Sequence, residues 1–302
     1  MHSGYHAGER AVQAQAGVLD KADRAAAVFV NHVPPVLRDF LQHQRFVVIG
    51  SLDERERVWA SIRYGDAGFA NFNESGELFI EHQPPDPEDP LAQSLQPGAP
   101  IGILAIEAQS RRRARMNGCI LANENGALRV HLDAIYSNCP KYIQARAIIR
   151  ADEIRCGGPA IRTVELSPMQ QRLIRSADTF FIASYFFEGG ADASHRGGNP
   201  GFVDAVSERE LVWPDYRGNS MFNTLGNILR NPSAGLLFVD WDTGSTLQLT
   251  GRAHIDWSDR RDRYAGAERL LRFTIDAVVE TPYALPFRWQ FESYSKANPP
   301  AP

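Results

Sequence analysis

The chain has 302 residues, of which 43% are hydrophobic and 23% are charged, and its formal net charge is -4 at pH 7. A slightly acidic balance argues against a general nucleic-acid or membrane-surface binder, so any anionic ligand would need a local basic site. The three cysteines, Cys119, Cys139 and Cys156, form no C-x-x-C pair, which disfavours a disulfide framework and a zinc site. No apolar run reaches the ~18 residues that span a bilayer, and the first residues lack the pattern of a signal peptide. We therefore expect a cytoplasmic protein with no metal site, no nucleic-acid partner and no membrane partner.

The first half of the chain predicts helices followed by short strands. Residues 1–35 have a helical composition, and "PPVLRDFLQHQ" places Leu37, Phe40 and Leu41 at helical spacing after two prolines. The runs "RFVVIGSL", "RVWASIRYG", "GELFIEH" and "PIGILAIEA" follow, rich in β-branched and aromatic residues and separated by turn residues. This spacing of short strands is typical of a β-barrel or sandwich.

The second half repeats this plan. A helix is predicted at "SPMQQRLIRSA", with Ser167 as N-cap and Pro168 at its first position, and strands follow from "DTFFIASYF" onward. Residues 46–121 align with residues 179–254 at a constant offset of 133 and without a gap. Identical pairs include Ser61/Ser194, Arg63/Arg196, Gly65/Gly198, Phe69/Phe202, Gly102/Gly235 and Gly118/Gly251. We interpret this match as an internal duplication.

The predicted fold class is mainly β with flanking helices (α+β), built as two tandem split β-barrels. We expect five regions along the chain: a helical extension at 1–35, a first barrel at 36–124, a helical linker at 125–165, a second barrel at 166–260, and a C-terminal helix with a Pro-rich tail at 261–302.

The two copies differ most in one loop. The second copy reads "WPDYRGNSMFNTLGN", in which Arg217, Gly218, Asn219 and Ser220 offer a guanidinium, backbone N–H groups, an amide and a hydroxyl, and Asn223 opens a predicted helix. This set suits a phosphate, which a helix N-terminus also favours. The first copy reads "IEHQPPDPEDPLAQS", whose acidic residues and prolines would repel a phosphate. The sequence thus predicts one anion site, at the second copy, although Arg-Gly-Asn-Ser can also be a solvated turn.

Four stretches in order, "SHRGGNPGFV", "LVWPDYRGN", "LGNILRNPSAGLLFVD" and "LQLTGRAHI", resemble the pyridoxamine 5'-phosphate oxidase-like family of flavin-binding split β-barrels. The resemblance covers about 170–256, and about 36–122 looks like a degenerate copy. "GYHAGERAVQAQAGV" and "SNCPKYIQAR" are similar to segments of a longer, duplicated subgroup. The resemblance implies FMN, rather than FAD, in a cleft between barrel strands, usually at a dimer interface.

Carried over by position, the resemblance assigns roles to three stretches of the second barrel. The first stretch would lie beside the flavin ring or its ribityl chain and consists of Ser194, His195, Arg196 and Gly197. The second would lie at the strand end and consists of Trp213, Pro214 and Asp215. The third would hold the phosphate and consists of Arg217, Gly218, Asn219 and Ser220. Relatives often carry a further basic residue where this chain has Ser220 and Met221, so either the phosphate is held less strongly or Arg217 and Arg196 supply the charge. No match to the C-terminal substrate segment of the pyridoxamine phosphate oxidases is found, so we do not predict that activity.

Four further features are candidates for the ligand site, and each has a functional and a purely structural interpretation. Lys141 lies over the flavin or is a surface lysine, and Cys139 is redox-active or simply packed. The basic run "SRRRARMNG" is expected to be a solvated hairpin tip, from which one Arg could approach a phosphate. His6 and Glu9 reach a neighbouring site or, as we favour, belong to a frayed terminus.

The leading functional hypothesis is an FMN-dependent oxidoreductase that acts on a small molecule and receives electrons from NAD(P)H or a reductase. His195 is the best candidate for a proton donor. The alternatives are a non-catalytic module that carries a flavin or another anionic cofactor, and a haem-binding relative, for which no isolated His stands out. Two barrels in one chain could hold one flavin between them, and we also expect a homodimer.

Overall fold

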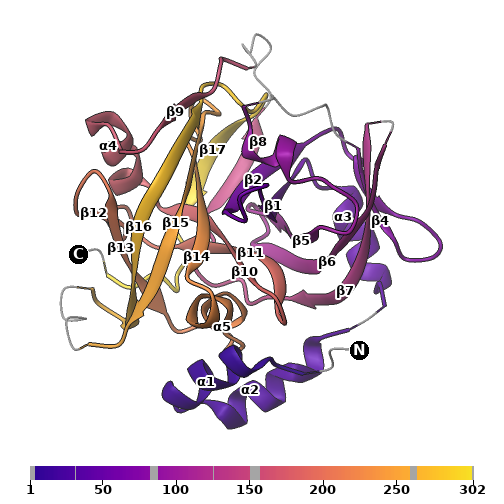
Figure 1. Ribbon diagram of the computed structural model, residues 1–302, viewed down its shortest axis with the longest axis horizontal. Helices are drawn as coiled ribbons and strands as arrows, with labels where there is room; N and C mark the ends of the chain where they lie inside the picture. The colour runs from indigo at the N-terminus through magenta and orange to yellow at the C-terminus, as the bar shows by residue number, and fades with distance from the viewer. Residues whose placement is uncertain are drawn as a thin grey trace.

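The computed structural model describes residues 4–30, 32–81, 88–124, 126–149, 157–258 and 264–300, and shows two curled β-sheets packed against each other with helices around them (Figure 1). The predicted fold class is confirmed. The helices are α1 (Ala7–Gln15), α2 (Leu19–Ala25), α3 (Pro35–Gln42), α4 (Pro168–Ser176) and α5 (Asn223–Arg230), with short 3-10 turns η1 (Ala26–Val28) and η2 (Pro90–Gln93). No helix in these ranges is long and apolar enough to cross a bilayer.

The first sheet has seven strands in the order β2-β1-β5-β6-β7-β4-β3. Their bounds are β1 Phe46–Leu52, β2 Val58–Tyr64, β3 Ala70–Phe72, β4 Leu78–Glu81, β5 Pro100–Glu107, β6 Arg112–Glu124 and β7 Ala127–Ser137. Neighbouring strands are antiparallel, and the apolar side chains of one face fill the interior of the first barrel.

The second sheet repeats this order as β11-β10-β14-β15-β16-β13-β12, with β9 added beside β16. The bounds are β9 Ile161–Thr163, β10 Thr179–Phe186, β11 Gly190–Gly197, β12 Asp204–Ala205, β13 Glu210–Tyr216, β14 Ser233–Val239, β15 Thr246–Asp256 and β16 Ala267–Thr281. A third, small sheet joins β8 (Ala145–Ile149) to β17 (Arg288–Ser293).

The two large sheets share local irregularities as well as strand order. The register of β6 against β7 shifts at Asn117/Gly118, and that of β15 against β16 shifts at Thr250/Gly251, which are equivalent positions at the offset of 133. Both glycines lie against a carbonyl of the facing strand, where a Cβ atom would not fit. The sequence predicted this correspondence from the constant offset.

The helices expected in two regions are wrong. The stretch expected to be a helical linker contains β7 and β8, and the stretch expected to be a C-terminal helix contains β16. In β7 every second residue from Leu128 to Leu132 is buried, the period of a half-buried strand, and β16 occupies the gap between β13 and β15 in its sheet. Sheet pairing therefore overrides the helical composition of "AERLLRFTIDAVVE". Residues 150–156, which include Cys156, and 259–263 lie outside the described ranges.

The two barrels pack through equivalent surfaces. A Cβ atom on Gly102 of β5 would lie 2.5 Å from Asp192 Cα in β11, and one on Gly235 of β14 would lie 2.6 Å from Trp59 Cα in β2. Gly102 is equivalent to Gly235 and Trp59 to Asp192, so one contact occurs twice about an approximate two-fold axis. A shared apolar core fills the space between the barrels, with members from β1, β2, β5, β10, β11, β14 and β17.

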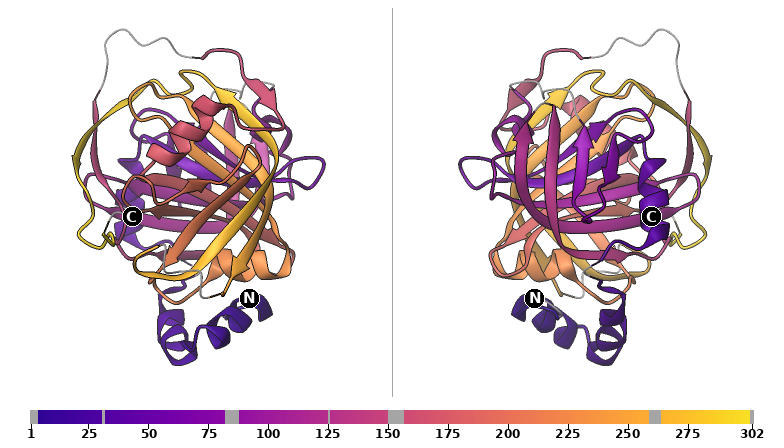
Figure 2. Two further views of the ribbon diagram at one scale, coloured as in Figure 1. Left: turned by 90° about the vertical axis from the view of Figure 1, so that its left-hand side faces the viewer. Right: turned by 90° about the vertical axis from the view of Figure 1, so that its right-hand side faces the viewer.

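The N-terminal helices lie at one end of this two-barrel body, beneath α5 (Figures 1 and 2).

Candidate functional site

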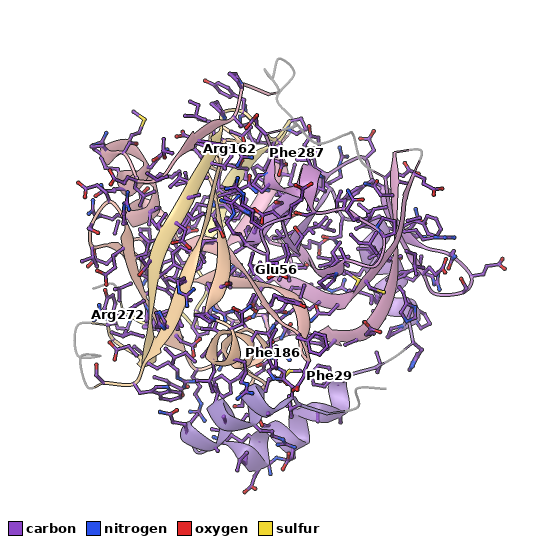
Figure 3. All side chains as sticks on the ribbon, in the orientation of Figure 1. Phe29, Glu56, Arg162, Phe186, Arg272 and Phe287 are labelled. Carbon is purple, nitrogen blue, oxygen red and sulfur yellow. The ribbon has the colours of Figure 1, made fainter. Side chains whose placement is uncertain are left out.

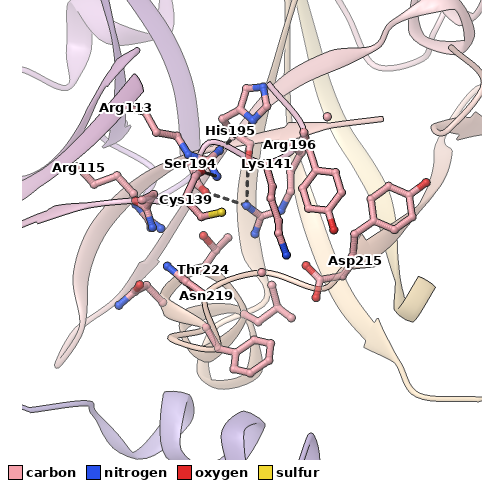
Figure 4. Close-up of a pocket in the computed structure, with 18 of the residues that line it drawn as sticks. Arg113, Arg115, Cys139, Lys141, Ser194, His195, Arg196, Asp215, Asn219 and Thr224 are labelled. Atoms are coloured by element: carbon pink, nitrogen blue, oxygen red, sulfur yellow. Dashed lines mark hydrogen bonds between the residues drawn. The ribbon is translucent and has the colours of Figure 1, made fainter. Parts of the chain in front are cut away.

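A pocket opens where the two barrels meet, and both contribute to its wall (Figure 4). From the first barrel come Leu104 of β5, Arg113 and Arg115 of β6, and the segment after β7. From the second come the end of β11, the end of β13, the loop that follows it and the first turn of α5. Neither barrel forms the pocket by itself.

The structure brings together most of the residues predicted from the sequence. Those that line the pocket are Lys141, Ser194, His195, Arg196, Gly197, Pro214, Asp215, Gly218, Asn219, Ser220 and Asn223. Trp213 is fully buried in the core of the second barrel, where its ring meets Phe180 edge to face at 5.3 Å. Arg217 is exposed outside the pocket lining, and its carbonyl oxygen accepts a hydrogen bond of 3.0 Å from the Tyr142 hydroxyl. The predicted roles of Trp213 and Arg217 at the ligand therefore do not fit their positions.

Two guanidinium groups from different barrels converge at the pocket. Arg113 donates to the Cys139 carbonyl oxygen at 2.7 Å, and Arg196 donates to Ser194 Oγ at 2.7 Å and to the His195 carbonyl oxygen at 3.1 Å. Neither forms an ion pair with a carboxylate of the described residues. Burial, followed by the charges of Arg196 and Arg115, lowers the pKa of Arg113 to about 9. Burial also lowers the pKa of Arg196, against the charge of Asp215, which raises it. Because Asp215 pairs with Arg269 at 3.4 Å, the pocket carries more positive than negative charge, which an anion would compensate.

Arg115 is compensated within the protein. Its guanidinium pairs with the buried carboxylate of Asp192, which also accepts a hydrogen bond of 2.7 Å from Thr224 Oγ1, and it lies 5.0 Å from the centre of the Tyr136 ring. This network joins β6, β11 and α5, so it holds the pocket wall together across the boundary between the barrels.

The backbone around the pocket is unusually strained. Three non-glycine residues of its lining, Tyr142, Ser220 and Phe222, have φ angles of 65°, 66° and 60°. Left-handed residues of this kind cost energy and are concentrated at functional sites. Phe222 directly precedes α5, and Asn223, Thr224 and Leu225 of its first turn line the pocket, so the positive end of the helix dipole faces the same space as the arginines.

His195 is a poor proton donor in this position. Burial, and then the charges of Arg113, Arg196 and Arg146, lower the pKa of His195 well below its usual value. Arg113 Nη1 lies 3.0 Å from Nδ1, and a guanidinium only donates, so Nδ1 accepts and the single ring proton is on Nε2. Because neighbouring residues of a strand alternate, the ring and the Arg196 side chain leave β11 on opposite sides. The geometry therefore argues against the predicted catalytic role of His195.

The equivalent position in the other half is closed by internal contacts. Arg63, the counterpart of Arg196, pairs with Asp89 at 3.0 Å, and Ser61, the counterpart of Ser194, accepts a hydrogen bond of 2.8 Å from Gln248. Asp89 also caps η2 through the Leu91 N–H at 2.9 Å. These contacts agree with the predicted loss of the anion site in the first copy. The predicted repulsive residues at 82–87, Asp86 among them, lie outside the described ranges.

The sequence predicted the contribution of the first barrel only in outline, as one arginine of "SRRRARMNG" that could approach a phosphate from a hairpin tip. The structure places this contribution in a strand instead, because β6 begins at Arg112 and carries Arg113 and Arg115 into the pocket. Their two-residue spacing, which puts both on one face of a strand, was the available signal. Lys141 is exposed at the pocket rim and Cys139 is partly buried there, so both of their interpretations stay open. Among the described residues no cluster of His, Cys, Asp or Glu could hold a metal.

Comparison with known proteins identifies one segment of the chain. Residues 166–286 match the family model described as pyridoxamine 5'-phosphate oxidase, and no curated protein matches the sequence. Similar solved structures include HupZ of Group A Streptococcus (10% identity over 38% of this chain and 98% of that chain, TM-score 0.31) and the FAD-binding protein of Mycobacterium smegmatis (12%, 41% and 98%, TM-score 0.27). A protein of Clostridium acetobutylicum related to general stress protein 26 is also similar, with 15% identity over 39% of this chain and 89% of that chain and a TM-score of 0.27. The family model therefore matches the second barrel, from α4 to β16, and not the first.

Proposed function

We propose that this protein is an FMN-binding flavoprotein and that the pocket between its barrels holds the cofactor. The observation that carries the proposal is the convergence of Arg113 and Arg196, two guanidinium groups without a carboxylate partner among the described residues, beside the first turn of α5. A phosphate monoester would supply the missing negative charge.

The residues present fit such a group. Arg113 Nε is buried without a hydrogen-bond partner among the described residues, so the pocket wall has a donor to spare. Ser194, Asn219 and Ser220 belong to the same lining, and the Asn219 amide bonds to Met221 through both its oxygen and its nitrogen, which orders this loop. We infer that Arg113 and Arg196 neutralise the phosphate and that the 218–220 loop and the first turn of α5 complete its shell. Compared with the sequence-based expectation of Arg217 and Arg196, this proposal keeps Arg196 and puts Arg113 in the place of Arg217.

When bound, FMN would supply hydride and electron transfer, which no protein side chain provides. The protein's part is to bind, orient and shield it. We propose an oxidoreductase in the cytoplasm that uses NAD(P)H or a reductase as electron donor and a small molecule as substrate. The phosphate argument favours FMN over FAD, whose phosphates are internal.

The two-barrel pocket also supports one cofactor per chain. We infer that the chain arose by duplication and that its barrels replace the two subunits of a dimer, since Arg113 and Arg196 come from different barrels of one chain. The Arg63–Asp89 ion pair closes the equivalent position. A homodimer is still proposed, but the pocket does not require it.

The phosphate can be tested separately from the flavin ring. Ligand-free protein should bind FMN at least about 100-fold more tightly than riboflavin, since two charge-assisted contacts to the phosphate are lost with riboflavin. Fluorescence quenching of each flavin measures the two dissociation constants. Equal affinity for both would contradict a phosphate-anchored cofactor.

A non-catalytic flavin carrier is the alternative, and the environment of His195 favours it, because burial and the neighbouring arginines make this histidine a poor proton donor. Asp215, whose pKa is raised by burial, is the remaining acid of the lining. Anaerobic addition of NADH or NADPH to the FMN-loaded protein distinguishes the two. Bleaching of the flavin absorbance that molecular oxygen or another acceptor reverses supports the oxidoreductase. A spectrum that neither nicotinamide changes favours the carrier or a separate reductase.

A further inference from the structure

The N-terminal helix α1 is firmly docked beside the pocket rather than frayed, as the sequence had suggested. It packs so closely on α5 that a Cβ atom on Gly226 would lie 2.5 Å from Glu9 Cγ and 2.6 Å from Glu9 N. Gln13 Nε2 donates to the Met221 carbonyl oxygen at 3.0 Å, which ties α1 to the loop before α5. The centres of the His6 and Phe186 rings are 5.3 Å apart. Figure 3 shows Phe186 at the place where the N-terminal helices meet the barrels.

One side chain of α1 reaches the lining of the pocket. Glu9 is only 5% exposed, and its carboxylate accepts from the His6 N–H at 2.7 Å and from Asn223 Nδ2 at 2.5 Å. Asn223 lines the pocket, and its Oδ1 is buried with no hydrogen-bond partner in the described part of the chain. The Asn223 side chain is thus held by Glu9 through its nitrogen, while its oxygen lacks a hydrogen-bond donor among the described residues.

We propose that Glu9 is a positioning residue that sets which atom Asn223 presents to the anion site. An ionised carboxylate can only accept, so it binds the amide N–H and leaves the Asn223 carbonyl oxygen for the pocket. A protonated Glu9 can donate to Asn223 Oδ1, which turns the amide and leaves its N–H groups for the pocket. The second arrangement suits a phosphate and the first opposes one. This inference rests on the proposed function.

The burial of Glu9 places this exchange near neutral pH. Burial raises the pKa of Glu9 to about 7, against the hydrogen bonds from His6 and Asn223 and the charges of Arg115 and Arg10, which lower it. The titratable or charged groups that face Glu9 are His6, Arg10 and Tyr5 from its own segment, Arg115 of β6, Tyr136 of β7, and Arg230 of α5.

The sign of the pH dependence follows from the raised pKa. Glu9 binds its proton as the pH falls through about 7, and Asn223 then offers a donor, so anion binding should become tighter below this pH. By reciprocity, an anion that prefers the protonated state raises the pKa of Glu9, so binding at pH 7 should take up protons.

The test measures the dissociation constant of FMN at pH 6 and pH 8 in the full-length protein and in Glu9→Gln, Asn223→Ala and the double variant. Glutamine mimics the protonated acid, and the titration of the FMN phosphate is common to all four proteins. At pH 8, Glu9→Gln should bind FMN about threefold to tenfold more tightly than the unaltered protein, the value of one ordinary hydrogen bond. At pH 6 the two should bind equally. Asp20→Asn, which removes an exposed carboxylate from α2, is the matched control and should follow the unaltered protein.

The double variant separates positioning from charge. If Glu9 acts through Asn223, the Glu9→Gln effect disappears in the Asn223→Ala background; if it persists, the carboxylate acts only by its field and the inference is overturned. An identical pH dependence in the unaltered protein and Glu9→Gln would overturn this inference and leave the proposed function standing. Failure of the unaltered protein to bind FMN would overturn both.

Discussion

Replacement of Arg196 by leucine should weaken FMN binding by about 10-fold to 100-fold, because it removes one of two charge-assisted contacts to the phosphate. The ligand-free protein should nevertheless keep its stability to within about 1 kcal/mol. Arg196 lowers the pKa of Arg113, so the two cations oppose each other when no anion lies between them, and this repulsion offsets the attraction between Arg196 and the buried Asp215 carboxylate. Loss of binding without loss of stability is expected of a residue kept for function.

Arg217→Leu is the matched control. Arg217 follows β13 in the same loop region but is exposed outside the pocket lining. We expect less than about a threefold change in FMN affinity from it, since an exposed charge acts weakly across solvent. Titration with FMN gives the dissociation constant of each variant, and thermal unfolding of the ligand-free variants gives the stability of each. Strong loss of binding in Arg217→Leu alongside normal binding in Arg196→Leu would contradict the assigned site and restore the sequence-based one.

Gly235→Ala should destabilise the protein by about 2–3 kcal/mol, although it adds only one methyl group. That Cβ would lie 2.6 Å from Trp59 Cα and 2.7 Å from Ala60 N, which are backbone atoms of the other barrel and cannot move aside as a side chain does. The barrels must separate locally to accept it. FMN binding should weaken as well, because the pocket needs Arg113 and Arg196 at a fixed separation, even though Gly235 lies outside the lining.

Urea unfolding measures the first effect and FMN titration the second. Gly4→Ala is the control, since no atom lies within 4 Å of the added methyl and the residue does not have a left-handed φ. A free energy of unfolding within about 0.5 kcal/mol of the unaltered protein would show that the barrels are not held in the close contact described.

The repeated barrel was predictable because strand pairing leaves a regular trace in the sequence. The offset of 133 relates Gly102 to Gly235 and Gly118 to Gly251, and each of these glycines is required by a close backbone approach. The strands β7 and β16, which come last along the chain in their sheets, were not predictable in this way. β16 is separated from β15 by a longer connection than β7 is from β6, so the constant offset ends there, and its Leu- and Arg-rich composition suits a helix equally well.

The residues on the second-barrel side of the pocket were predictable, whereas on the first-barrel side only a general contribution by one arginine was. Ser194, Arg196 and Asn219 belong to local sequence motifs, but Arg113 is singled out only because the barrels pack face to face. Glu9 was likewise treated as part of a loose end, since no local pattern reveals that Gly8 and Gly226 allow α1 to dock on α5. Contacts between segments distant in sequence decide both cases.

The central claim is that one FMN lies between the two barrels of each chain. An absorption spectrum of the purified protein, followed by release of the cofactor by heat and its identification and quantification by mass, tests this claim most directly. The account predicts a flavin spectrum and FMN released at about one per chain. A colourless protein that takes up no added FMN, or a stoichiometry of two per chain, would contradict it.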